Sequence, residues 1–198
     1  DVSTAVERGL VDVDVWATGR SYYGPETLMM EVTNLTDEPL GIRMPQGLRF
    51  RSTDSRYQDE IMALTERVEL DPADTITTGL TTFCGNAHRA APVRDVAYEI
   101  GEVEGRQMQN LLETLDERGH EDDATGQWAV WTLTDDVPSM PDFSGGLEGD
   151  GDIRTMIESG PAIAGPVVRS VLRAAWLRTF WWWIAIPLAV LLIALLLW

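Results

Sequence analysis

Short runs of alternating apolar and polar residues fill the first hundred positions of the chain. The clearest is Leu10–Trp16, whose valines fall on one side of an extended chain and whose aspartates fall on the other. Further strands are predicted at 27–33, 40–44, 48–52, 61–70, 75–83 and 96–100, with turn-forming residues at 34–39, 45–47 and 71–74. Short strands that recur at about this spacing are typical of a sandwich. We therefore predict a mainly β fold, with an immunoglobulin-like β-sandwich over residues 1–102.

The pattern changes to a helical period after Gly101. Apolar residues recur at the i, i+3, i+4 and i+7 spacing from Met108 to Leu115, which predicts an amphipathic helix over 103–118 that ends at Gly119. A second helix is predicted over 123–134, with acidic residues at its N-terminus and two tryptophans among its apolar residues. Together these helices form a predicted helical appendage over residues 103–136.

The C-terminal third divides into a linker and an apolar segment. Residues 137–165 are rich in Gly, Pro and Asp, which predicts a linker. Residues 166–198 are predicted to form a juxtamembrane and transmembrane helix, because Thr179–Trp198 carries no charged side chain and a helix of that length spans roughly 30 Å. The predicted membrane-interface residues are Arg178, Trp181, Trp182, Trp183 and Trp198, and small residues for helix packing are Ala185 and Ala189.

Composition restricts the partners. The net charge is −17 and all fifteen basic residues are arginine, so the surface repels nucleic acid, and we expect no nucleic-acid partner. The predicted span holds no ionisable side chain, which favours an anchoring or packing role in the lipid bilayer over ion or proton transport. The single cysteine excludes an internal disulfide.

Two observations disagree about the side of the membrane. A chain that starts at Asp1 is consistent with a cleaved signal peptide, and Asn34–Thr36 is a glycosylation sequon. Arg169, Arg173 and Arg178 before the span instead favour a cytoplasmic domain. Because a signal peptide would set the topology first, we favour a periplasmic or extracellular domain at the cell membrane, with the cytoplasmic side as the alternative.

Two segments concentrate residues that could carry chemistry. Cys84 and His88 lie close together after a strand, and with His120 or a carboxylate they could form a metal site, or His88 could activate Cys84 as a nucleophile. The spacing favours a third interpretation, a buried Cys84 and a loop histidine, so we assign no catalytic, cofactor or metal residue. The acidic run 148–152 could bind calcium, but without a distal Glu at EF-hand spacing a solvated turn is favoured.

Two local resemblances add to this interpretation. The stretch 31–40, with 45–50 and the Cys84-x-Asn86-x-His88-Arg89 segment, resembles uncharacterised bacterial envelope proteins with an immunoglobulin-like β-sandwich. The stretch 127–131, Gln-Trp-Ala-Val-Trp, is similar to the Gln-x-Ala-Ile/Val-Trp signature of thioester domains on bacterial surfaces, with Gly126 where that family usually has threonine. That resemblance implies a reactive thioester between Cys84 and Gln127. A helix that packs its tryptophans onto the sandwich is the alternative.

Two functions from different classes follow. The first is a non-enzymatic accessory or scaffold subunit that is anchored by a single span and braces a larger membrane protein complex, such as an energy-transducing or photosynthetic one. The second is a cell-surface adhesin or ligand-binding receptor, with the Cys84–Gln127 thioester as its most specific form. We predict no enzyme and no cofactor, because no grouping of acid, base and nucleophile is recognisable.

Overall fold

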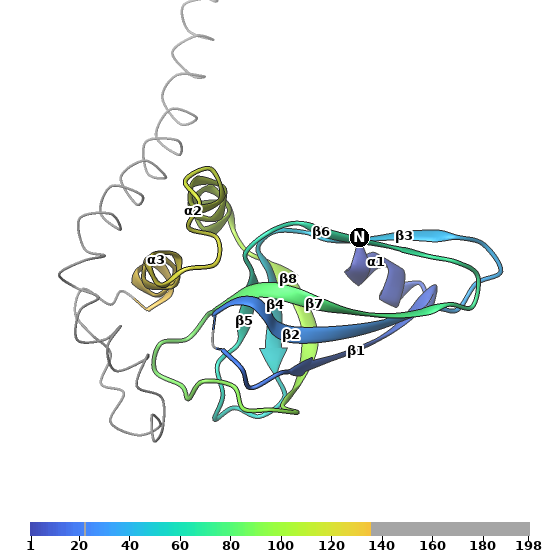
Figure 1. Cartoon of the computed structure of the whole chain (residues 1–198), viewed down its shortest axis with the longest axis horizontal. Helices are drawn as coiled ribbons and strands as arrows, with labels where there is room; N and C mark the ends of the chain where they lie inside the picture. The colour runs from blue at the N-terminus through green and yellow to red at the C-terminus, as the bar shows by residue number, and fades with distance from the viewer. Residues whose placement is uncertain (22, 136–198) are drawn as a thin grey trace, which may run out of the picture.

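The computed structural model describes residues 1–21 and 23–135, which form a closed antiparallel β-barrel with helices beside it (Figure 1). The barrel strands are β1 (Val11–Ala17), β2 (Tyr23–Asn34), β7 (Thr75–Cys84), β5 (Glu60–Met62), β4 (Leu48–Ser52) and β8 (Ala97–Val103), in this order around the barrel. β3 (Leu40–Met44) and β6 (Glu66–Leu70) pair as a separate two-stranded sheet. The helices of the described part are α1 (Val2–Glu7), α2 (Arg106–Asp116) and α3 (Ala124–Thr134).

The mainly β character is confirmed, but the immunoglobulin-like sandwich is wrong. β1 pairs along its whole length with β2, and its other edge pairs with β8 through Val15–Tyr98 and Trp16–Ala97, so the sheet closes on itself. Register shifts in the β2–β7 and β4–β8 pairs bend these strands, as bulges do, and bending is what a small barrel needs. The period of two is the same in a sandwich and in a barrel, so the sequence pattern could not separate them.

Most strand positions agree with the sequence prediction, whereas the run 61–70 is two strands. β5 belongs to the barrel and β6 pairs with β3, with residues 63–65 between them. The predicted turn residue Asn34 is buried, and its Nδ2 donates to the carbonyls of Glu38 and Asp71 at 2.8 and 2.9 Å. Asn34 therefore holds two turns together, and a glycan on Nδ2 would displace these bonds.

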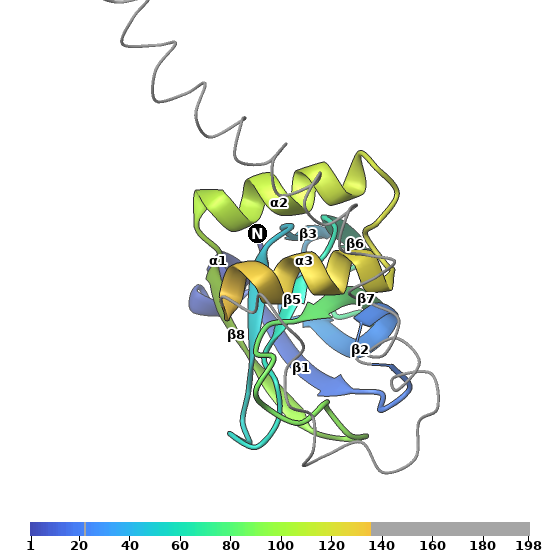
Figure 2. The ribbon, with the colours of Figure 1, turned by 90° about the vertical axis from the view of Figure 1, so that its left-hand side faces the viewer.

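Two apolar clusters stabilise the described part. The first fills the barrel and extends to α1 and the β3–β6 sheet, and it includes Met30, Phe50 and Met62. The second lies between the barrel and the two later helices, and it includes Ile61, Phe83 and Leu111. Figure 2 shows α2 and α3 lying one above the other across this side of the barrel.

The later helices lie close to their predicted positions. The apolar positions of α2 are buried, and Gly119 follows the helix with a positive φ of 68°, as a glycine that ends a helix does. Asp123 caps α3 by accepting a bond from the Gly126 N–H. The division into a domain over 1–102 and an appendage over 103–136 stays a prediction, although both helices share an apolar cluster with the barrel.

The remaining sequence predictions concern residues 136–198. The linker, the acidic run 148–152 and the span with Arg178, Trp181, Trp182, Trp183, Trp198, Ala185 and Ala189 lie outside the described residues. Within residues 1–21 and 23–135, no helix combines the length and the apolar character needed to cross a bilayer.

Candidate functional site

Cys84 ends strand β7 directly opposite Glu60 of β5. The next pair along is hydrogen-bonded, since the N–H of Gly85 donates to the carbonyl of Asp59 at 2.7 Å. Pairs in an antiparallel ladder alternate, so the N–H and C=O of Cys84 face away from β5, while the side chains of Cys84 and Glu60 lie close together. The Sγ of Cys84 donates to Oε1 of Glu60 at 3.0 Å.

Gln127 of α3 fills the side of Cys84 that β5 leaves open. The described part of strand β2 begins at Tyr23, which lies opposite Phe83. The Cys84 N–H donates to Oε1 of Gln127 at 2.8 Å, and Nε2 of Gln127 donates to the Cys84 carbonyl at 2.9 Å. Both residues are fully buried. The carboxamide of Gln127 thus satisfies both backbone polar groups of Cys84.

Gly126 lets α3 come this close to the barrel. A Cβ at this position would lie 2.2 Å from the carbonyl oxygen of His120 and 2.5 Å from the ring of Phe83, so neither threonine nor alanine fits without a shift. Asp123 fixes the same turn, because its Oδ1 accepts from the Gly126 N–H at 3.0 Å. The thioester-domain signature usually has threonine where this chain has Gly126, and the lack of space for a Cβ explains this difference.

Cys84, Gln127 and Glu60 form a buried polar cluster, and the hydroxyl groups of Thr82 and Thr27 extend it from Glu60 along the inner face of the barrel. Thr82 donates to Oε2 of Glu60 at 2.5 Å, and Oγ1 of Thr27 lies 2.5 Å from Oγ1 of Thr82. Thr27 also reaches the carbonyls of Gly24 and Leu80, each at 3.3 Å. All three side chains are fully buried, so each polar atom depends on these bonds.

Burial shifts both titrating groups of the cluster. Burial raises the pKa of Glu60 to about 8, against the lowering effect of its bonds from Cys84 and Thr82. Burial also raises the pKa of the Cys84 thiol well above its usual value, and the nearby Glu60 adds to this shift. Cys84 is consequently a thiol at neutral pH, and its reaction requires a partner that takes the proton.

Buried aromatic side chains pack around Gln58, two residues before Glu60. Trp131 of α3 donates through Nε1 to Oε1 of Gln58 at 3.2 Å, and the Tyr98 hydroxyl donates to the Gln58 carbonyl at 3.0 Å. Trp128 packs edge-to-face on Trp131, with ring centroids 5.9 Å apart. Both tryptophans are buried. A helix that packs its tryptophans onto the β domain was the alternative to the thioester in the sequence analysis. The structure shows that this packing and the Cys84–Gln127 contact are compatible.

The histidines do not join this cluster. His88 is exposed, whereas the Cys84 Sγ is buried and bonds to Glu60, so the Cys84–His88 nucleophile is not assembled. His120 bonds through Nδ1 to Asp123 at 2.7 Å. Within the described ranges, no group of three His, Cys, Asp or Glu side chains is placed to hold a metal ion.

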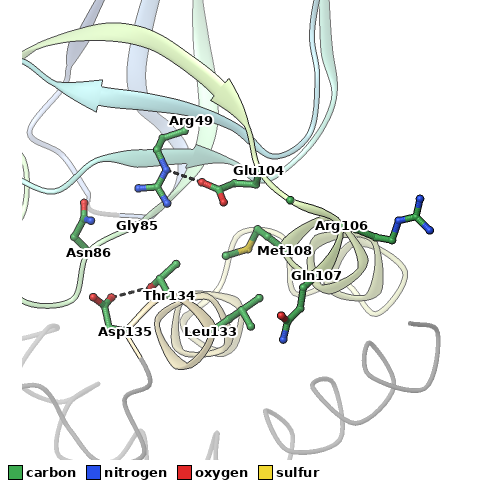
Figure 3. Close-up of a pocket in the computed structure, with 11 residues that line it drawn as sticks. Arg49, Gly85, Asn86, Glu104, Arg106, Gln107, Met108, Leu133, Thr134 and Asp135 are labelled. Atoms are coloured by element: carbon green, nitrogen blue, oxygen red, sulfur yellow. Dashed lines mark hydrogen bonds and ion pairs between the residues drawn. The ribbon is translucent and has the colours of Figure 1, made fainter. Parts of the chain in front are cut away.

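A cleft of about 450 Å³ opens beside the end of β7 (Figure 3). Gly85, the residue after Cys84, lines it, as do the start of α2 and the end of α3. Arg49 reaches across one wall to Glu104 at 2.5 Å, and Asp135 on another wall accepts from the Ala87 N–H at 2.8 Å. The cleft therefore extends to the residue next to Cys84, although Gly85 itself is buried.

Comparison with known proteins gives no match to a family model, to a curated protein or to a solved structure. Both sequence resemblances stay predictions.

Sequence reasoning named Cys84 and Gln127 but missed Glu60, Thr82 and Thr27. The signal for Glu60 was weak, namely an acidic residue directly before the apolar Ile61 and Met62. Its partners come from β7 and β2, which the strand order β5–β7–β2 brings together.

Proposed function

We propose that this chain is a non-enzymatic binding module in which Cys84 and Gln127 form an internal thioester that attaches the protein covalently to amines of a partner. One observation carries the proposal: a buried carboxamide and a buried cysteine, 43 residues apart in sequence, are held together by two hydrogen bonds. The thioester-domain signature around Gln127 supports the same pair of residues.

The contacts suit the formation of a thioester. The Cys84 thiol adds to Cδ of Gln127, the C–N bond breaks, and ammonia leaves. The Cys84 N–H already points at Oε1 of Gln127, the atom on which negative charge develops as the sulfur adds. The Cys84 carbonyl holds the amide nitrogen that departs. Neither oxidant nor metal is needed for this exchange.

Burial suits the survival of the product. A thioester in contact with bulk water hydrolyses, and here both side chains are fully buried. The cleft beside Gly85 offers an approach from solvent to the same strand end. An attacking amine would take the acyl group of Gln127 as an amide and release the Cys84 thiol.

The partner would carry exposed primary amines, such as the lysine side chains of a protein surface. An amine is mainly cationic in water, and the net charge of −17 attracts cations. An anionic partner such as nucleic acid or an anionic lipid surface would be repelled by the same charge.

Intact-mass measurement of the purified full chain tests the proposal. We expect a mass about 17 Da below the calculated value, from the ammonia lost, and the addition of about 31 Da with methylamine. Cys84→Ala and Gln127→Glu should abolish both changes, while the control Thr77→Val, at an exposed position outside the cleft, should keep them. A full-mass protein whose Cys84 thiol reacts in denaturant at once would contradict the proposal.

The accessory-subunit function stays a prediction. The residues that motivated it lie in 166–198, outside the described part of the chain. Co-purification of stoichiometric membrane partners after gentle detergent extraction would support it.

A further inference from the structure

We propose that Glu60 is the catalytic proton carrier of the thioester: it takes the proton of the Cys84 thiol when the thioester forms and returns it to the leaving ammonia. This inference rests on the proposed Cys84–Gln127 thioester and adds a residue that the signature does not contain. Among the described residues, Glu60 is the acidic side chain that hydrogen-bonds Sγ, with Oε1 3.0 Å away.

The neighbouring acid is engaged elsewhere. Asp59 accepts the backbone N–H of Ser52 at 3.1 Å and pairs with Arg49 and Arg89 at 3.2 and 3.3 Å. It therefore faces the charged side of the strand end, while Glu60 faces the barrel interior.

The two threonine hydroxyls let Glu60 exist with or without its proton. When Glu60 is ionised, Thr82 donates to Oε2 and Thr27 donates to Thr82. When Oε2 is protonated, the chain reverses: Glu60 donates to Thr82, Thr82 to Thr27, and Thr27 to the carbonyl of Leu80 or Gly24. Every hydroxyl keeps a partner in both arrangements, so Glu60 can rest either ionised or with a proton on Oε2 without leaving a buried polar atom unsatisfied. The oxygen that faces Sγ, Oε1, stays available in the ionised form to take the thiol proton.

The step balances in atoms and protons. The S–H bond of Cys84 breaks and its proton moves to Oε1 of Glu60 as Sγ bonds to Cδ of Gln127. The C–N bond then breaks, and Glu60 gives the proton to the departing nitrogen, which leaves as ammonia. When a partner amine later attacks, Glu60 can take a proton from that amine and return one to Sγ, which leaves as the thiol.

The pKa of Glu60, raised to about 8, predicts the pH dependence. Only the ionised carboxylate accepts the thiol proton, so the rate of thioester closure should rise about tenfold per pH unit below pH 8 and level off above it. The other titratable groups near Glu60 are Asp59 beside it, Cys84 on β7 and Tyr98 on β8. Burial raises the pKa of Tyr98, so it stays protonated over this range.

The test follows closure of the thioester in the full chain. Ammonium opens the thioester to the thiol and the amide, and removing it by desalting starts closure, which is followed by the loss of about 17 Da. The wild type should show the pH profile above. Glu60→Gln keeps the size and can still accept from Sγ and pair with Thr82, so it should fold yet close about 100-fold more slowly. Thr77→Val, an exposed change on β7, is the control and should close at the wild-type rate.

The outcomes separate the two proposals. If Glu60→Gln closes as fast as the wild type, or if wild-type closure does not change between pH 6 and 8, Glu60 is not the proton carrier, although the thioester stands. If the wild type never shows the mass deficit, the thioester fails and the role of Glu60 fails with it. The pH dependence of the closure rate is measured on the wild type alone, so the test holds even if Glu60→Gln does not fold.

Discussion

The two faces of strands β5 and β7 differ sharply although both are buried. On the outer face, Ile61 and Phe83 lie opposite each other and pack under the later helices. On the inner face, Glu60 lies opposite Cys84, and Thr82 continues the polar row. Alternation along a strand places these two sets one residue apart in sequence.

The difference assigns separate roles to the two faces. The outer face needs only shape and apolar area, and it attaches α3 so that Gln127 reaches Cys84. The inner face contains buried polar groups, which cost free energy unless each one is bonded. Their retention inside a barrel that is otherwise filled with apolar side chains is what we expect of a site rather than of a core.

The largest expected effect concerns pH and the inner face. The pKa of Glu60 is about 8 in the folded chain against 4.5 ordinarily, so the folded state holds this proton more tightly. The contribution of Glu60 to stability should be fully present below pH 4.5, fall as pH rises to 8, and level off above, with a total loss of up to about 5 kcal/mol. Denaturant unfolding of Cys84→Ala, which forms no thioester, measures this loss. Adding Glu60→Gln should remove most of the pH slope, and an unchanged slope would place the cause elsewhere.

Phe83→Ala should weaken the packing of the later helices on the outer face. Phe83 is fully buried between the barrel and α3, so its loss should lower the free energy of unfolding by about 3–5 kcal/mol. Val93→Ala, at a residue that is 49% exposed, should change it by less than about 0.5 kcal/mol. Equal effects of the two substitutions in a denaturant titration would show that α3 does not depend on this face.

Gly126→Ala tests the close approach that links the two faces. Its Cβ would meet the His120 carbonyl and the Phe83 ring, so we expect a loss of about 1–3 kcal/mol and a lower yield of thioester. Gly41→Ala is the matched control, since it is exposed and a Cβ there meets only the carboxyl group of the Glu69 side chain, so it should have little effect. A normal thioester yield in Gly126→Ala would mean that α3 can shift without moving Gln127.

Thr82→Val sharpens the assignment of the inner row and should have the smallest effect. Valine keeps the shape but removes the hydroxyl that bonds both Glu60 and Thr27, at a cost of about 1–2 kcal/mol. Thr77→Val on the exposed side should leave the unfolding midpoint unchanged. If both variants unfold alike, the hydroxyl row does not stabilise Glu60.

Local pattern alone located most of the secondary structure. The alternation around β1 and the helical spacing from Met108 to Leu115 depend on which residues share a face, and that follows from the geometry of one strand or one helix. Gly119 and Asp123 marked helix ends for equally local reasons. The signature at 127–131 also pointed to Gln127 and, through the resemblance, to Cys84.

Only the tertiary structure decided how the strands pair and what surrounds Cys84. The closure of β1 on β8 and the division of 61–70 into strands of two sheets depend on contacts between distant segments, which a period of two does not encode. Glu60 became part of the site because β5 places it opposite Cys84, and Gln127 reaches the N–H and C=O of Cys84 because α3 packs against this end of β7. The sequence by itself determined which residues can share a face; the pairing register, set by the packing of the whole barrel, determined which of them meet.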